Sequence, residues 1–170
     1  MGGEYRNLLG YLPQEFGFYP EFTVKDYLLY IAALKGIRPI VAKKKVNKLL
    51  AQVGLSKAAN KKMRKLSGGM KRRAGIAQAI LNDPKILILD EPTASLDANA
   101  ENLLYKKYRE LSTKKISFFV SHRLASCIFC DSILVFDKGQ IVQQGNHKTL
   151  IHDTSGLYAQ MFNLQAAQYK

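Results

Sequence analysis

The apolar run Ile86-Leu87-Ile88-Leu89, which ends in the acidic pair Asp90-Glu91, limits the possible folds of this chain more than any other segment. A continuous apolar run of this length is typical of a strand buried on both faces of a parallel sheet. Parallel strands need crossover connections, and helical patterns flank the run on both sides. We therefore predict an α/β fold in which helices and a parallel sheet form three layers.

Local signals place the remaining elements. We expect helices to begin after the N-cap Thr23, at Pro39 and after Ser67-Gly68-Gly69. The apolar face of the first helix includes Val24, Tyr27, Leu28, Ile31 and Leu34. We expect strands at 9–12, 116–120, 133–136 and 141–144, the second of them also buried and the last two joined by a tight turn. A helix over about 99–111 and two short helices at the end of the chain complete the prediction.

Length, cysteine content and charge restrict the class of protein. The 170 residues suit one domain, two cysteines are too few for a disulfide framework, and no apolar run approaches the roughly 20 residues of a membrane helix. We expect a cytosolic protein. The net charge is +13, and 14 of the 26 basic residues lie between Lys35 and Arg73. This segment either attracts nucleic acid, anionic lipid headgroups or nucleotide phosphates, or is a solvated helix face.

The acidic pair after the apolar run is the first candidate site. In open parallel sheets, ligands bind beyond the carboxyl ends of the strands. Asp90 can hold Mg²⁺, a hard cation that prefers oxygen ligands, and Glu91 can accept a proton from an attacking water or orient it. The alternative is a strand that ends in an ordinary acidic turn.

Three further segments carry candidate ligands. Ser67-Gly68-Gly69 brings backbone amides to a helix N-terminus, which favours a phosphate, although the same residues also form an ordinary cap. His122 follows the strand at 116–120, where it either bonds a terminal phosphate or is a polar loop residue. Gln14 can complete a metal or water shell through its amide oxygen. By contrast, the pair Cys127 and Cys130 lacks the second pair that a metal site needs.

Five segments, taken in order, resemble the motifs of the ABC ATPase family. They are Tyr11 to Gln14 (Q-loop), Leu66 to Arg73 (signature motif), Ile86 to Thr93 (Walker B), Ser95 to Asp97 (D-loop) and Ser121 to Arg123 (switch-histidine loop). The resemblance covers nearly the whole chain. It implies a P-loop NTPase-like parallel sheet core with an α-helical signature subdomain over about 15–83. A catalytic core over about 84–150 and C-terminal helices over about 151–170 would follow.

The resemblance also implies an activity and its cofactors. Such a domain binds and hydrolyses ATP with Mg²⁺ and thereby powers transmembrane transport. By resemblance, Asp90 and Gln14 would hold Mg²⁺, and Glu91 would be the general base. His122 would contact the γ-phosphate.

The same resemblance implies partners and a location. Two ATP-binding domains would form a head-to-tail dimer with two ATP molecules between them. The residues that would contact the partner domain or its nucleotide are Ser67, Gly68, Gly69, Met70 and Asp97. A transmembrane subunit would dock around Gln14 and Phe16–Phe22, which implies a peripheral position at the cytoplasmic face of a membrane. No specific nucleic-acid partner is implied.

One family motif is absent from the 170 residues. A phosphate-binding loop needs G-x-x-x-x-G-K-[S/T], and neither Gly-Lys-Ser nor Gly-Lys-Thr occurs in the chain. We therefore expect a domain that lacks its N-terminal strands and Walker A helix and that binds ATP weakly or not at all by itself. Two alternatives are a non-enzymatic fragment that offers only its signature surface, and a soluble ABC protein that acts on nucleic acid or the ribosome.

The two halves of the chain resemble different branches of the family. Residues up to about Leu89 resemble stand-alone ATPase subunits of multidrug-type transporters. Residues from about Ser95 resemble ATPase domains fused to the membrane segments of exporters. A join within Leu89 to Ala94 is one hypothesis for this difference.

Overall fold

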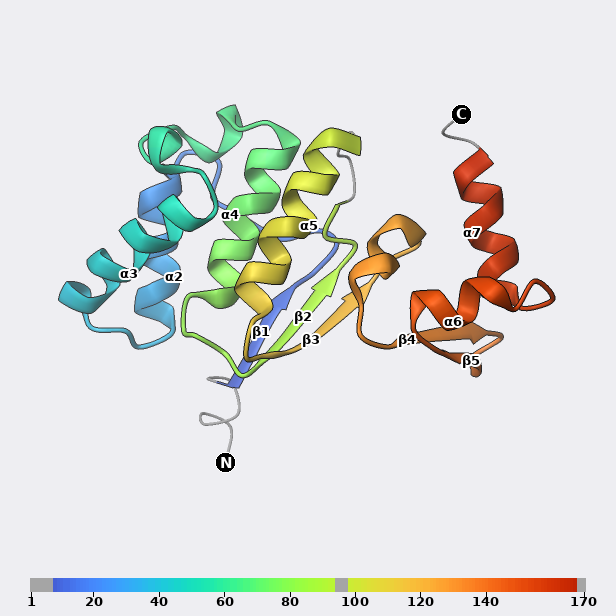
Figure 1. Ribbon diagram of the computed structural model, residues 1–170. Coiled ribbons are helices and arrows are strands. Elements are labelled where there is room, and N and C mark those ends of the chain that lie inside the picture. The colour runs from blue at the N-terminus through green and yellow to red at the C-terminus, as the bar shows by residue number, and fades with distance from the viewer. Residues whose placement is uncertain (1–7, 94–97, 168–170) are drawn as a thin grey trace. The chain divides into compact units, whose positions relative to one another are not determined.

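The chain forms two compact units, residues 1–120 and 121–170, each with its own hydrophobic core. The computed structural model describes residues 8–93 and 98–167 (Figure 1). The subdivision expected from the family, near residues 83 and 150, stays a prediction.

The first unit contains a parallel sheet of three strands. These are β1 (Leu9–Leu12), β2 (Ile86–Asp90) and β3 (Ile116–Val120), in the order β1-β2-β3. Leu12 pairs with Leu89, and Leu89 pairs with Phe119. The parallel sheet with helical crossovers confirms the predicted α/β class.

Four α-helices belong to the described part of this unit: α2 (Val24–Leu34), α3 (Pro39–Gln52), α4 (Gly68–Ile80) and α5 (Ala98–Ser112). Two short 3₁₀ helices, η1 (Ser56–Ala58) and η2 (Met63–Lys65), lie between α3 and α4. The predicted starts of α2 and α3 are confirmed, whereas α4 begins at Gly68, two residues earlier than predicted. The Thr23 hydroxyl accepts a hydrogen bond from the N–H of Asp26 at 3.1 Å, and the Ser67 hydroxyl accepts one from the N–H of Met70 at 3.3 Å. Pro39 is the first residue of α3.

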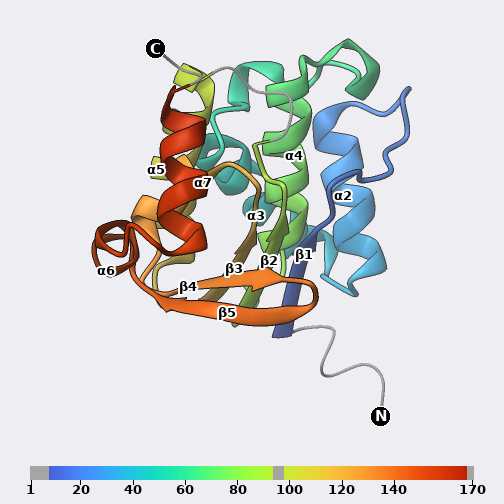
Figure 2. The same ribbon diagram turned by 90° about the vertical axis from the view of Figure 1, so that its right-hand side faces the viewer.

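Helix α4 occupies the centre of the first unit. It lies beside α5, with α2 on its other side (Figures 1 and 2), and it packs directly on β1. Gly10 permits this approach, because a Cβ atom there would stand 2.3 Å from the carbonyl oxygen of Ala79. The close contact places the N-terminal half of α4 next to the loop that follows β1.

One face of the sheet is buried and the other is partly exposed. Leu87 and Leu89 are fully buried, whereas alternate β3 residues are more than half exposed: Ile116 (62%), Phe118 (52%) and Val120 (54%). The prediction that this strand is buried was therefore wrong. An apolar run shows that a strand is hydrophobic, but it does not show that both faces find a packing partner.

A second correction concerns the end of α2. Val24, Tyr27 and Leu28 are buried as predicted, but Leu34 is 67% exposed. Leu34 is the last residue of the helix and is followed by a left-handed Gly36 that redirects the chain. Leu34 therefore belongs to the helix as predicted, but the hydrophobic core does not extend to this end of the helix.

The second unit is built around a β-hairpin. After η3 (Leu124–Phe129), the strands β4 (Ile133–Asp137) and β5 (Gln140–Gly145) pair antiparallel, and α6 (His147–His152) and α7 (Leu157–Ala167) follow (Figure 2). Its core consists of Leu124, Ile133, Val135, Leu150 and Tyr158. These elements confirm the predicted hairpin and the two final helices.

Candidate functional site

The segments after β1 and β2 leave the sheet at neighbouring positions. Because Leu12 pairs with Leu89 in parallel, Gln14 on one side and Asp90 and Glu91 on the other emerge at the same edge. Ligands of open parallel sheets bind at this edge. Three of the predicted site residues are therefore carried by one edge of the first unit.

Glu91 has a backbone conformation that residues with side chains rarely adopt. Its φ angle is 45°, in the left-handed region that favours glycine. Its N–H donates to the carbonyl of Val120 at 2.9 Å, and the residue is only 8% exposed. Such conformations cost on the order of 1 kcal/mol and persist only where the surrounding structure holds them.

Arg72 on α4 supplies much of that support. Its guanidinium is buried and donates to five backbone carbonyls. These belong to Pro13 (2.8 Å) and Gln14 (2.7 Å) after β1, and to Asp90, Glu91 and Pro92 (3.1 Å) at the end of β2. A guanidinium has five N–H donors, so every one of them is used. One side chain thus joins the helix to both loops.

The charge of Arg72 suits this role. Burial lowers the pKa of Arg72, while the nearby groups Tyr108, Asp90 and Glu91 act in the opposite direction. A guanidinium nevertheless stays protonated in proteins. Charged donors make stronger hydrogen bonds than neutral ones, so the two loops are held firmly against α4.

A buried hydroxyl network continues the site from Pro92 towards α5. The Thr93 hydroxyl is fully buried and donates to the Glu101 carboxylate at 3.1 Å. It also lies 2.9 Å from the Tyr105 hydroxyl. The Tyr108 hydroxyl donates to the carbonyl of Pro92 at 3.3 Å. Burial raises the pKa of Tyr108 well above its usual value, so this hydroxyl remains a donor at neutral pH.

The predicted phosphate-binding residues form the exposed start of α4. Ser67 caps the helix, and Ser67 and Gly68 are both exposed. Gly69 and Met70 are half-buried, and Met70 packs against the core. The helix N-terminus therefore presents backbone amides at the surface, an arrangement that favours an anion.

An open groove of about 320 Å³ separates the loop after β1 from the start of α4. Its lining residues are Gln14, Glu15, Phe16, Phe18, Gly68, Lys71 and Arg72. The Lys71 ammonium lies 5.2 Å from the centre of the Phe18 ring, which is within cation–π range. The groove thus combines an aromatic wall with polar groups from both predicted motifs.

Two predicted site residues are not brought into this arrangement. Asp97 lies outside the described residues. His122 belongs to the second unit, where it is exposed and its backbone carbonyl accepts a hydrogen bond from Gln165. Since the two units are described separately, the expected contact of His122 with the γ-phosphate stays a prediction.

The two cysteines lie on and after η3 in the second unit. Burial raises the pKa of both thiols, that of Cys130 to about 11, so they are protonated at neutral pH. Among the described residues, no group of three or more His, Cys, Asp or Glu side chains is arranged to hold a metal ion.

Sequence reasoning missed Arg72, although a signal for it exists. Lys71-Arg72-Arg73 lies in the basic segment and at the end of the signature motif, but neither pattern gives Arg72 a structural role. Arg72 lies one helical turn before Ile76, which is buried, and so belongs to the core-facing side of α4. A basic residue on the apolar face of a helix indicates a buried charge with specific partners.

Comparisons with known proteins agree with the motif pattern. The family model described as "ABC transporter" matches residues 3–94. An uncharacterised ABC transporter ATP-binding protein of Bacillus subtilis, YxlF, is 37% identical over 85% of this chain and 50% of its own length. The toxin RTX-I translocation ATP-binding protein of Actinobacillus pleuropneumoniae is 42% identical over 59% of this chain and 14% of its own length.

A solved structure gives the same result in three dimensions. The structure of a bacterial Atm1-family ABC exporter with ATP bound superposes with a TM-score of 0.79 and 28% identity, and the match covers 95% of this chain and 29% of that one. The chain spans half or less of the length of these relatives. In the described segments, no helix has the length and apolar character needed to cross a membrane.

Proposed function

Because the chain belongs to the ABC transporter family, we propose that it is part of an ATP-binding, ATP-hydrolysing component of a transporter. The observation that carries this proposal is the Arg72 guanidinium. It binds the signature helix to the Q-loop and to the end of the Walker B strand within one unit. Relatives named as ATP-binding proteins of translocation systems support the same role.

The residues at the edge of the sheet fit Mg²⁺ and a hydrolytic water. The donor set consists of the Asp90 carboxylate and the Gln14 amide oxygen, both of the hard oxygen type that Mg²⁺ prefers. When bound, Mg²⁺ would neutralise charge on the phosphates of ATP. Glu91 would act as general base by accepting a proton from the attacking water. The backbone contacts of Arg72 and Val120 would hold Glu91 in position.

The exposed start of α4 would serve a second ATP-binding domain. Ser67, Gly68 and Gly69 present amides and a hydroxyl that suit the γ-phosphate of an ATP held mainly by that partner. In this proposal Met70 anchors the segment to the core, and Asp97 contributes across the dimer. The groove beside Phe16 and Phe18 would receive a helix of a transmembrane subunit, which places the chain at the cytoplasmic face of a membrane.

ATP binding tests this proposal directly. The 170 residues contain no G-x-x-x-x-G-K-[S/T] loop, so we expect weak or no binding of Mg-ATP by this chain alone. An extended version that carries such a loop upstream should bind Mg-ATP at micromolar to millimolar levels in equilibrium dialysis. Equal binding by both versions would contradict the assignment of the phosphate contacts.

Glu91→Gln in the extended version tests the catalytic role. Glutamine keeps the size of the side chain but cannot accept the proton, so we expect ATP hydrolysis to fall at least about 100-fold with ATP affinity unchanged. Glu110→Gln is the matched control, because Glu110 is exposed and, among the described side chains, its ion pair is with Lys107 on the same helix. If the extended version binds ATP but Glu91→Gln leaves hydrolysis intact, the non-enzymatic alternative gains support.

A further inference from the structure

The turn between α2 and α3 exposes apolar side chains that the core does not use. Leu34, at the end of α2, is 67% exposed, and Ile40, at the start of α3, is 76% exposed. Val41 is 39% exposed. We call residues 34–44 the α2–α3 corner. Single exposed apolar residues are ordinary on protein surfaces. Three within eight positions of one turn are a local concentration of exposed apolar side chains, here called the patch.

Exposed basic side chains lie in the same segment as this patch. Arg38, Lys43 and Lys44 are all exposed, and Lys48 continues the outer face of α3. Lys35 is half-buried and donates to the Asn82 side chain at 3.0 Å. The corner therefore combines exposed aliphatic and cationic groups on consecutive turns of the chain.

Acidic residues do not compensate this charge. Residues 27–82 contain 14 Lys and Arg and no Asp or Glu. The nearby Asp83 already bonds Lys115, which is the main reason for its lowered pKa, and Lys45 and Lys48 contribute only more weakly. Among the described residues, no ion pair involves a basic side chain of the corner.

We propose that the α2–α3 corner binds the surface of an anionic lipid bilayer. Ile40, Val41 and Leu34 would enter the headgroup boundary, while Arg38, Lys43 and Lys44 face the lipid phosphates. Stable attachment to a membrane surface generally needs two signals, and an apolar contact with a polybasic patch is one such pair. Each basic residue near such a surface contributes roughly fivefold in affinity.

The aliphatic character of the patch favours lipid over nucleic acid. Proteins that bind single-stranded nucleic acid stack bases on aromatic rings. The corner contains no aromatic residue between positions 34 and 48. A phosphate backbone would remove little apolar surface of Ile40, Val41 and Leu34 from water. The acyl chains of a bilayer would bury that surface, which is favourable.

Tryptophan fluorescence tests this placement, because the chain contains no tryptophan. Ile40→Trp should shift its emission to the blue on addition of phosphatidylcholine vesicles with about one third phosphatidylglycerol, but not with phosphatidylcholine alone. Phe118→Trp on β3 is the matched control at another exposed apolar position. A shift of Phe118→Trp without one of Ile40→Trp, or no shift of either, would overturn the proposal.

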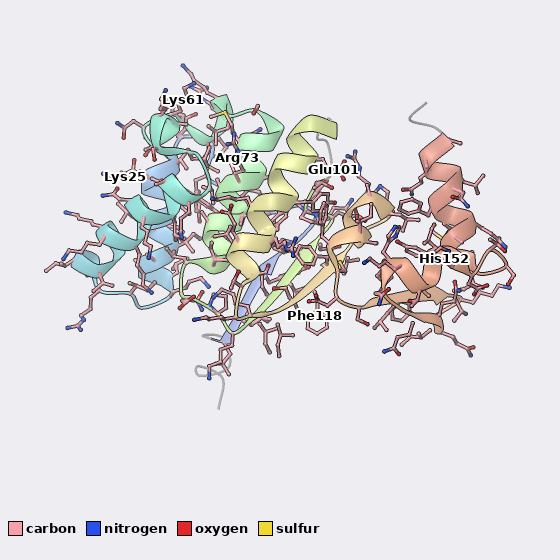
Figure 3. All side chains as sticks on the ribbon, viewed as in Figure 1. Lys25, Lys61, Arg73, Glu101, Phe118 and His152 are labelled. Atoms are coloured by element: carbon pink, nitrogen blue, oxygen red, sulfur yellow. The ribbon has the colours of Figure 1, made fainter. Side chains whose placement is uncertain are left out.

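Charge reversal tests the electrostatic part. Lys43→Glu with Lys44→Glu should weaken binding to the same anionic vesicles about tenfold or more in a co-sedimentation assay. The control pair Lys57→Glu with Lys61→Glu makes the same change of net charge at the other end of the helical layer, where Figure 3 labels Lys61. Its effect should be less than about threefold. If both pairs weaken vesicle binding equally, the effect comes from net charge in general. That result would contradict a specific role of the α2–α3 corner in lipid binding.

A labelled single-stranded RNA provides the competing outcome. If RNA binds more tightly than the vesicles at physiological salt, and Lys43→Glu with Lys44→Glu abolishes that binding, the surface belongs to nucleic acid and the proposal fails. None of these measurements requires ATP. A negative result in the vesicle experiments would therefore not contradict the proposed ATP-binding role. A negative result in the ATP-binding experiment would likewise not contradict lipid binding by the corner.

Discussion

The guanidinium of Arg72 links backbone segments that lie 58 and 19 residues away in sequence, namely the loops that carry Gln14 and Glu91. Removal of the donor would leave buried carbonyls without partners, and each such group costs about 1–3 kcal/mol. We expect Arg72→Met to lower the free energy of unfolding of the chain by about 3 kcal/mol or more in urea titrations. Amides after β1 and β2 should also exchange hydrogen faster.

Arg73→Met and Arg72→Lys are the controls for this prediction. Arg73 makes longer hydrogen bonds of 3.3–3.4 Å to carbonyls of Gly69, Val53 and Gly54, and it is only half-buried. Arg73→Met should lower the free energy of unfolding by less than about 1 kcal/mol. Lysine at position 72 offers three donors instead of five and should recover part of the stability. An equal cost for both methionine variants would argue against a special role for Arg72.

Elements that depend on local signals were predictable, and those that depend on distant partners were not. Thr23 and Ser67 mark helix starts because a cap hydroxyl bonds an amide three residues later. The burial of β3 depends on what covers each face of the sheet, which no local pattern encodes. The sequence placed Asp90 at the carboxyl end of a parallel strand, but the side chain that joins this strand end to the loop after β1, Arg72, could not be predicted.

The contact between β1 and α4 sets the distance between the sheet and the signature helix. A Cβ atom at Gly10 would lie 2.3 Å from the Ala79 carbonyl oxygen and 2.7 Å from Pro84, so the helix would have to move. We expect Gly10→Ala to destabilise the chain by about 1–3 kcal/mol, as overpacked cores generally do. Thermal unfolding followed by circular dichroism would measure this. Gly17→Ala is the control, since nothing lies within 4 Å of a Cβ atom there. A comparable loss of stability in Gly17→Ala would contradict the contact argument.

At the scale of the whole molecule, a net charge of +13 opposes the association of a sheet face that carries exposed Ile116, Phe118 and Val120. An exposed apolar edge strand is a template for pairing with another chain, while like charges keep copies apart. Salt screens the charges over about 8 Å at physiological ionic strength but leaves the apolar attraction. Self-association measured by light scattering should therefore increase as salt is added. Ile116→Thr with Phe118→Thr should suppress the increase. Leu164→Thr, at an exposed position on α7, is the control and should leave the salt-induced increase in self-association unchanged. If self-association instead decreases as salt is added, attraction between charges drives the contact and the prediction is wrong.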